Sequence, residues 1–241
     1  MIRASLRNPS GARGFFLPWR GLLAAFAVCL TLSAPFAAAP RDVERLRGEL
    51  VARFDASRLP LLDAWLEAVS AAARRHREED KLAQINDFVN ANIFFEDDIS
   101  VWGVSDYWAT PLETIGQGRG DCEDFAIIKY VSLRMAGISS AKLRLVYAKA
   151  RLNGEAGPVW MAHMILAYYA APDAEPLILD NLDERIVPAS RRPDLQPIFS
   201  FNSAGIFAGV SGRGAARAAA GIGRLSRWED AWRRIQADGY Q

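Results

Sequence analysis

The spacing of the apolar residues changes part-way along this chain, and that change constrains the fold more than any other feature. From residue 42 to about residue 93, apolar side chains recur at helical spacing in three stripes, represented by Leu46, Trp65 and Ile85. Beyond residue 143 the pattern alternates instead, which is typical of β-strands. Helices that are followed by strands, rather than interleaved with them, indicate an α+β fold.

Three segments carry the alternating pattern and are expected to be strands: 143–150, 160–169 and 177–180. The connections between them are short and rich in turn-forming residues. Because short connections favour antiparallel pairing, we expect the N-terminal helices to be followed by an antiparallel β-sheet.

One more helix is expected between the two regions. Three glycines between Gly116 and Gly120 favour a tight backbone turn, and Asp121 follows them as a candidate N-cap. The helix should run to Met135 and stop before Gly137.

The first 39 residues are typical of an export signal. Every charge before Asp42 is positive, and the uncharged apolar segment 21–39 follows Arg20 and ends in three alanines. The same segment reaches the length of a membrane span, so an uncleaved N-terminal anchor is the alternative. We predict export, with membrane contact only through this segment if it stays uncleaved.

The charge balance argues against nucleic-acid binding. The chain has 29 Lys and Arg residues against 28 Asp and Glu residues, a formal net charge of +1. Removing residues 1–39 removes four Arg and no acid, which leaves 25 basic and 28 acidic residues and a net charge of −3. No basic excess then remains to neutralise phosphates, and we expect no nucleic-acid partner.

The cysteine usage points to one residue. Of the two cysteines, Cys29 lies in the export segment, so the exported body retains only Cys122 and cannot form an internal disulfide. A lone thiol in an oxidising compartment is a liability unless it is buried or used. Cys122 would occupy the first turn of the helix after Asp121, where backbone N–H groups and the helix dipole favour a thiolate. The negative charges of the flanking acids Asp121, Glu123 and Asp124 disfavour the thiolate.

Two other residues complete a candidate catalytic set. Of the two histidines, His76 lies in the mixed charge run 74–80, which we interpret as a solvated helical face. His163 lies within the apolar segment 160–165, either as a core histidine bonded to the backbone or as a base. Asp180 ends the next expected strand, either as a turn acid or as the group that orients the imidazole. A thiol, a His and an Asp in these positions match a cysteine-based triad.

Four blocks of sequence together carry a specific resemblance. They are Trp108-Ala-Thr-Pro111, Gly120-Asp-Cys-Glu-Asp-Phe-Ala-Ile127, Ala162-His-Met164 and Leu179-Asp-Asn-Leu182. They closely resemble the LapG-type periplasmic cysteine proteases, the bacterial transglutaminase-like cysteine proteinases, and the resemblance extends from about residue 45 to the end. It implies a papain-like, transglutaminase-like core in which Cys122, His163 and Asp180 form the triad.

The sequence pattern and the resemblance together divide the chain into three expected parts. We expect residues 1–39 to be the export signal or anchor and residues 40–204 to be the transglutaminase-like protease domain. Residues 205–241 comprise a Gly- and Ala-rich segment and a C-terminal helix. That helix is expected to place Trp228 and Trp232 on one face, packed against the domain.

The resemblance also implies an activity and its partners. Enzymes of this type cleave the N-terminal region of a large surface adhesin at a di-alanine site, which releases the adhesin and disperses biofilm. They require calcium and are held inactive by an inner-membrane receptor that senses cyclic-di-GMP. Asp121 and Glu123 match the calcium-associated positions, and Asp124 is a further candidate. Calcium would offset the acids beside Cys122, and its six to eight ligands call for additional oxygens, for which the Asp97-Asp98 loop is a candidate.

Two other functions fit the same residues. One is acyl transfer to an amine, as in transglutaminases that share the core. The other is a calcium-binding module without catalysis, in which Cys122 is a buried apolar residue. If the chain is a protease, the backbone N–H of Cys122 is the first oxyanion donor, and Gln117 and Trp108 are upstream candidates for the second. Trp102, Tyr107 and Trp108 could line a substrate or partner surface, with at least one of them in the core.

Overall fold

The computed structural model describes residues 43–154, 157–208 and 222–240. The expected export segment 1–39 lies outside the described residues, as do residues 209–221 of the expected Gly- and Ala-rich segment. Within the described ranges, none of the helices combines the length and the hydropathy that a membrane crossing requires.

The three apolar stripes form three helices, as predicted: α1 (Val43–Arg53), α2 (Leu59–Ala73) and α3 (Glu78–Asn92), with a short 3-10 turn at Ala56–Arg58. Each helix buries the middle of its stripe, and Leu46, Trp65 and Ile85 are fully buried. The charge run 74–80 is only partly helical, because Arg74 caps α2 and α3 begins at Glu78. The three acids in the first turn of α3 complement the positive end of its dipole.

The segment before Cys122 contains more structure than its sequence indicates. A two-residue strand, β1 (Phe94–Phe95), pairs in parallel with β2 (Arg119–Gly120), and α4 (Asp98–Trp102) and α5 (Pro111–Gln117) lie between them. The turn predicted over residues 116–120 therefore involves fewer residues than expected. Gly116 lies inside α5, pressed against the Phe54 ring, and the chain reverses at Gly118, which has a φ of 69°.

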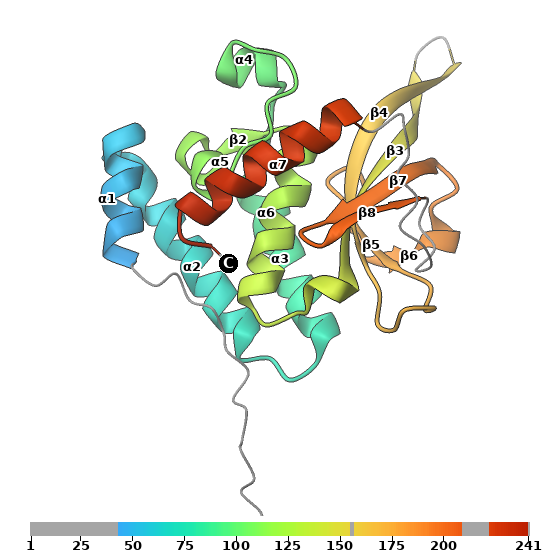
Figure 1. Cartoon of the computed structure of the whole chain (residues 1–241), viewed down its shortest axis with the longest axis horizontal. Helices are drawn as coiled ribbons and strands as arrows, with labels where there is room; N and C mark the ends of the chain where they lie inside the picture. The colour runs from blue at the N-terminus through green and yellow to red at the C-terminus, as the bar shows by residue number, and fades with distance from the viewer. Residues whose placement is uncertain (1–42, 155–156, 209–221, 241) are drawn as a thin grey trace, which may run out of the picture. The chain divides into compact units, whose positions relative to one another are not determined.

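The central helix α6 (Cys122–Met135) begins and ends where the sequence predicts. The Asp121 carboxylate accepts a hydrogen bond from the backbone N–H of Glu123, so Asp121 is its N-cap. The helix contacts α2 and α3 as well as strands of the sheet, and Figure 1 shows it between these two groups of elements. Cys122 is thereby held at the boundary between the helical part and the sheet.

An antiparallel sheet of six strands follows, in the spatial order β6-β5-β4-β3-β7-β8. The strands are β3 (Leu143–Gly154), β4 (Gly157–Tyr168), β5 (Leu177–Leu179), β6 (Val187–Pro188), β7 (Leu195–Asn202) and β8 (Gly205–Ala208). The first, second and third predicted strands correspond to β3, β4 and β5, and the α+β fold class is confirmed. The strands β6, β7 and β8 were not predicted. Pro188 and Pro197 weaken the strand pattern of β6 and β7, and β8 lies at the start of the segment expected to be rich in Gly and Ala.

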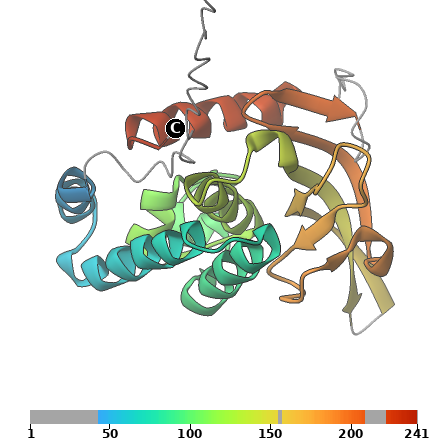
Figure 2. The same cartoon turned by 90° about the horizontal axis from the view of Figure 1, so that it is seen from below.

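The C-terminal helix α7 (Ile222–Ala237) lies across α6 (Figures 1 and 2). Its Trp228 ring is buried and lies 5.3 Å from Trp232, so both side chains share a face. Both rings contact Tyr130 of α6, and Trp228 also packs on Phe201 of β7. This aromatic cluster ties α7 to the helix that carries Cys122.

Candidate active site and acid cluster

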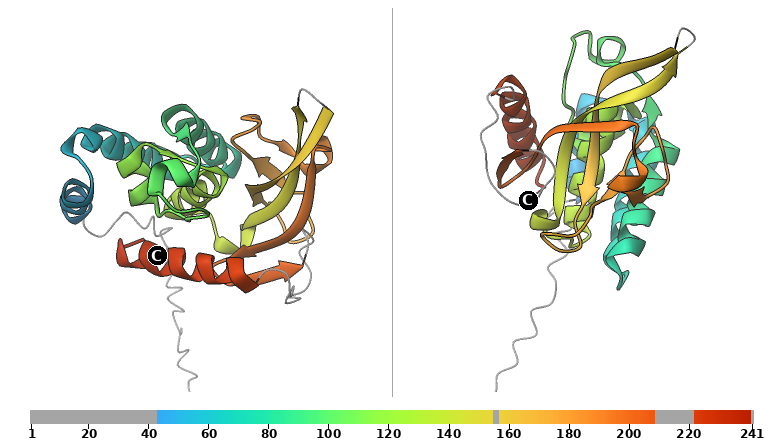
Figure 3. Two further views of the ribbon diagram at one scale, coloured as in Figure 1. Left: turned by 90° about the horizontal axis from the view of Figure 1, so that it is seen from above. Right: turned by 90° about the vertical axis from the view of Figure 1, so that its right-hand side faces the viewer.

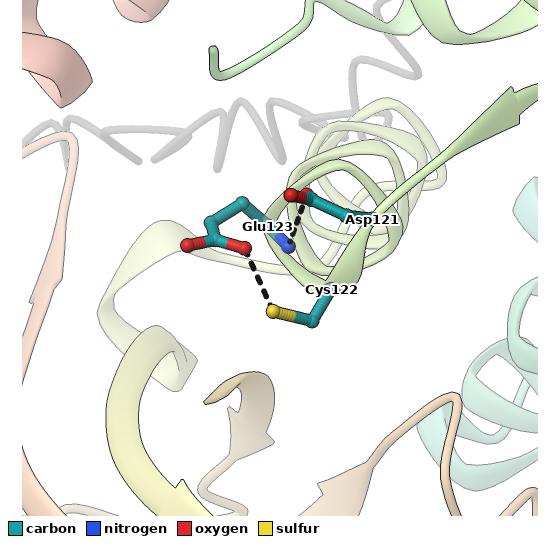
Figure 4. A group of neighbouring side chains, drawn as sticks. All are labelled: Asp121, Cys122 and Glu123. Atoms are coloured by element: carbon teal, nitrogen blue, oxygen red, sulfur yellow. Dashed lines mark hydrogen bonds between the residues drawn. The ribbon is translucent and has the colours of Figure 1, made fainter. Parts of the chain in front are cut away.

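The thiol of Cys122 is buried at the first position of α6, with 8% of the residue exposed. It donates a hydrogen bond to Oε2 of Glu123 at 2.7 Å, as Figure 4 shows. Burial, together with the charges of Glu123 and Asp121, raises the pKa of the thiol well above its ordinary value. The backbone N–H of Met164, on β4, faces the sulfur and acts in the opposite direction.

His163 and Asp180 are brought together by the pairing of β4 with β5. His163 lies on β4, and Asp180 directly follows β5, whose Leu179 pairs with Leu166. Nε2 of His163 and Oδ1 of Asp180 are 2.7 Å apart, and both residues are almost fully buried. With Nε2 occupied in this way, Nδ1 is the ring nitrogen left for a substrate or a thiol. His163 is adjacent to Met164, whose N–H faces the Cys122 sulfur.

Asp180 is held ionised and fixed by several neighbours. Burial alone would raise its pKa, but the hydrogen bond and charge of His163 and the guanidinium of Arg192 lower the pKa to about 2. Arg192 donates to Oδ2 at 2.7 Å, within a buried ion pair. Nζ of Lys129 and Nδ2 of Asn90 each donate to the backbone carbonyl of Asp180 at 2.9 Å.

Sequence reasoning missed these neighbours of Asp180. Arg192 follows Arg191, which is exposed, and the sequence does not distinguish the buried arginine from the exposed one. Lys129 lies on α6 among apolar residues, where a buried charged side chain is unusual. That position could have indicated a functional role for Lys129.

Four acids gather beside Cys122. Asp98, Asp121 and Asp124 each place a carboxylate oxygen within 4.8 Å of the others, and Glu123 joins Asp121 and the Cys122 sulfur in an overlapping group. We call Asp98, Asp121, Glu123 and Asp124 the acid cluster. Three of these were predicted as calcium-associated residues. Asp98 was anticipated only as part of its loop, and its exposed neighbour Asp97 does not take part.

The acids of the cluster repel one another in the absence of a cation. Burial and, to a smaller extent, the neighbouring carboxylates together raise the pKa of Asp98 to about 6 and that of Asp121 to about 10. The pKa of Asp124, which is fully buried, is likewise raised well above its ordinary value. Carboxylates arranged in this way bind either protons or a cation.

The donor atoms of the cluster fit a calcium ion. Oδ1 of Asp98 and Oδ2 of Asp124 are buried without a hydrogen-bond partner, and carboxylate oxygens are the ligands that calcium prefers. Oδ1 of Asp124 is fixed by the backbone N–H of Ala109 at 2.8 Å. A Cβ at Gly120 would overlap the Asp124 carboxylate, so only glycine admits it there. An open pocket reaches the cluster from solvent, with a lining that includes Asp97, Asp98, Ile99, Ser105, Asp106, Asp121 and Glu123.

Of the aromatic residues Trp102, Tyr107 and Trp108 upstream of Cys122, one is buried in the core and two are half-buried. Trp108 is buried, its ring stacks on Phe201, and its indole N–H donates to Asp106 at 3.0 Å. That N–H is therefore not free to serve as an oxyanion donor. Trp102 and Tyr107 are half-buried and pack against each other, and Gln117 is half-buried at the last residue of α5.

A family profile and the solved structures that match this chain identify the same family. A family profile described as bacterial transglutaminase-like cysteine proteinase BTLCP matches residues 66–193. LapG of Legionella pneumophila is 34% identical, the match covers 80% of this chain and 97% of that one, and the TM-score is 0.63. No curated protein matches the sequence.

Two further solved structures of Legionella pneumophila LapG also match this chain, one calcium-bound and one EGTA-treated. The calcium-bound form is 35% identical over 79% of this chain and 98% of that one, with a TM-score of 0.63. The EGTA-treated form is 33% identical over 80% of this chain and 97% of that one, with a TM-score of 0.64.

Proposed function

The chain belongs to the bacterial transglutaminase-like cysteine proteinases, and we propose that it is a calcium-dependent endopeptidase with Cys122 as its nucleophile. The observation that carries this proposal is the buried His163–Asp180 pair, next to the residue whose N–H faces the Cys122 sulfur. A thiol at a helix N-terminus, beside an imidazole that a carboxylate orients, is the arrangement used in covalent catalysis by cysteine.

The substrate, compartment and regulator are part of the proposal. The chain is exported to the periplasm by residues 1–39 and cleaves the N-terminal region of a large surface adhesin at a di-alanine site. Cleavage releases the adhesin and promotes dispersal of biofilm. An inner-membrane receptor that senses cyclic-di-GMP holds the enzyme inactive. These assignments are supported by the membership in the family and by the likeness to LapG over most of both chains.

The reaction begins at the thiol. Asp180 fixes Nε2 of His163, and Nδ1 takes the proton from Cys122, whose sulfur attacks the scissile carbonyl carbon. The backbone N–H of Cys122, at the first turn of α6, donates to the oxyanion that forms. Collapse of this tetrahedral intermediate breaks the C–N bond of the substrate. The amine leaves with the proton from His163, and a thioester on Cys122 remains. Water, activated by His163, then hydrolyses the thioester and frees Cys122.

The acid cluster prepares Cys122 for this reaction. Asp98, Asp121 and Asp124, with Glu123, would hold calcium, which supplies positive charge beside the nucleophile. Glu123 accepts the thiol hydrogen in this structure. As a calcium ligand, the Glu123 carboxylate would no longer compete with His163 for that proton. We propose that this is why the activity depends on calcium.

The proposed function is tested by the products formed from an N-terminal adhesin fragment that contains the di-alanine site. The chain, with calcium and excess primary amine, should give two fragments with free termini and no amine incorporated. Incorporation of the amine would instead indicate a transglutaminase-type acyl transferase. An intact fragment would indicate a binding module.

Removing the ion pair that holds Asp180 should slow the chemical step. Arg192→Met leaves Asp180 buried with one charged partner fewer, so we expect kcat to fall about 10- to 100-fold while KM changes little. Burial then raises the pKa of Asp180 from about 2, and the acid limb of the kcat/KM profile should move to higher pH. Steady-state kinetics between pH 4 and pH 8 check both effects.

The control variants separate positioning from folding. Arg192→Lys retains a cation and should recover part of kcat and part of the shift in the pH profile. Arg191→Met changes the exposed neighbour and should leave both unchanged. A fall in activity without any change in the pH profile would contradict the positioning role of Arg192.

A further inference from the structure

One edge of β4 is open over most of its length. On one side β4 pairs with β3 from Gly157 to Tyr168, but on the other side β5 covers only the stretch from Leu166 to Tyr168. Among the residues that the structure describes, no strand pairs with 157–165 on that side. The β3–β4 hairpin extends beyond the neighbouring strands of the sheet in Figure 1 and in the right-hand view of Figure 3.

Two contacts identify which backbone groups face the open edge. The N–H of Tyr169, directly after β4, donates to the carbonyl of Lys142 on the β3 side at 2.8 Å. The N–H of Met164 points the other way, to the Cys122 sulfur. Because successive residues of a strand direct N–H and C=O to opposite sides, Trp160 and Ala162 face the open edge together with Met164.

The side chains along this edge are exposed and mostly apolar. Val159, Trp160 and Met161 are 57%, 48% and 39% exposed, and Ala162 is exposed as well. A long apolar edge strand invites pairing with another chain, and proteins usually blunt such edges with charges, prolines or a covering element. Here the edge carries none of these between Val159 and Met164 in the described structure, and it leads directly to the candidate nucleophile.

We propose that the open edge of β4 receives the substrate polypeptide as an added β-strand. An extended segment of the adhesin pairs its backbone with Trp160 and Ala162, and the peptide bond that follows the paired stretch lies at Cys122. This inference rests on the proposed function and deepens it. The distance from Trp160 to Met164 is about 13 Å along a strand, which accommodates about four substrate residues. Main-chain pairing of this kind selects unfolded, extended segments.

The test compares two variants of the full chain at one position. Trp160→Pro removes an N–H that faces the open edge and leaves the hydrogen bonds to β3 intact, whereas Trp160→Val removes the same ring but keeps the N–H. With calcium and the di-alanine adhesin fragment, kcat/KM of Trp160→Pro should be about tenfold below that of Trp160→Val. The rate at which iodoacetamide alkylates Cys122 should be the same in both variants.

A second measurement keeps the inference testable if proline disrupts the hairpin. In Cys122→Ala, with calcium and the intact fragment, the amides of Trp160 and Ala162 should gain protection from hydrogen exchange. The amide of Met161 faces β3 and should not change. Equal kcat/KM values for the two variants, or no gain of protection, overturn the inference and leave the protease intact.

Two other outcomes are distinguishable. If the wild-type chain does not cleave the fragment at all, the proposed function fails, and this inference fails with it. If the wild-type chain sediments as a dimer that Trp160→Pro converts to a monomer, the edge pairs two copies of the chain, and the substrate role is overturned.

Discussion

Replacing Cys122 by alanine should abolish cleavage of the adhesin fragment, with a fall in kcat of at least about 10⁴-fold. Cys122 is the free cysteine of the described structure, and its sulfur lies at the N-terminus of α6 beside the strand that carries His163. Without the sulfur no thioester can form, and the His163–Asp180 pair has no nucleophile to activate. The rate of fragment formation in calcium, followed on gels and by mass spectrometry, measures the effect.

Two comparisons make the Cys122 result specific. Cys29→Ala alters the other cysteine of the chain and should leave kcat unchanged, because Cys29 precedes the expected protease domain. Cys122→Ala should still bind calcium, since the carboxylate oxygens that fit the ion remain. Cleavage by Cys122→Ala within tenfold of the wild-type rate would show that another group is the nucleophile.

Removing one buried carboxylate from the acid cluster should abolish activity at micromolar calcium. In Asp98→Asn and Asp124→Asn, a charged oxygen ligand becomes a neutral amide, and we expect calcium affinity to fall at least about 100-fold. Isothermal titration calorimetry gives the affinity directly. The calcium dependence of the cleavage rate should shift in parallel.

The stability of the same variants separates a ligand from an ordinary buried acid. In EGTA, Asp124→Asn should melt no lower than wild type, because the change relieves repulsion among crowded carboxylates. In calcium, the wild type should gain in melting temperature, whereas Asp124→Asn should not. Asp97→Asn, a change at an exposed neighbour, should behave as wild type throughout. Wild-type calcium affinity in Asp98→Asn would place the ion elsewhere.

The parts of the site that the sequence could predict are those with a local signal. The glycines and acids around Cys122 indicate that this lone cysteine lies at the start of a helix and is a candidate site residue. His163 lies in an apolar strand and Asp180 directly follows one, and strands joined by a short connection pair, which brings the two residues together. The same reasoning predicted the helices of the N-terminal region, because each buries a stripe with a clear helical period.

The parts that could not be predicted depend on contacts between distant segments. Asp98 reaches the cluster because β1 pairs with β2 beside it, and a two-residue strand has no sequence signature. Arg192 ends among buried groups only because the chain after β6 folds back toward Asp180. The strand β7 contains Pro197 and a register shift opposite β3, which interrupts its alternation. In each case tertiary contacts outweigh local propensity.

If this chain hydrolyses one peptide bond through Cys122, the adhesin fragment gains a single new N-terminus, and sequencing that N-terminus is the decisive measurement. Wild type and Cys122→Ala would each be incubated with the fragment in calcium and in EGTA, and the products sequenced from the N-terminus. Wild type in calcium alone should give one new N-terminus, between two alanines. Cuts at many positions, or the same cut in EGTA or by Cys122→Ala, would contradict it.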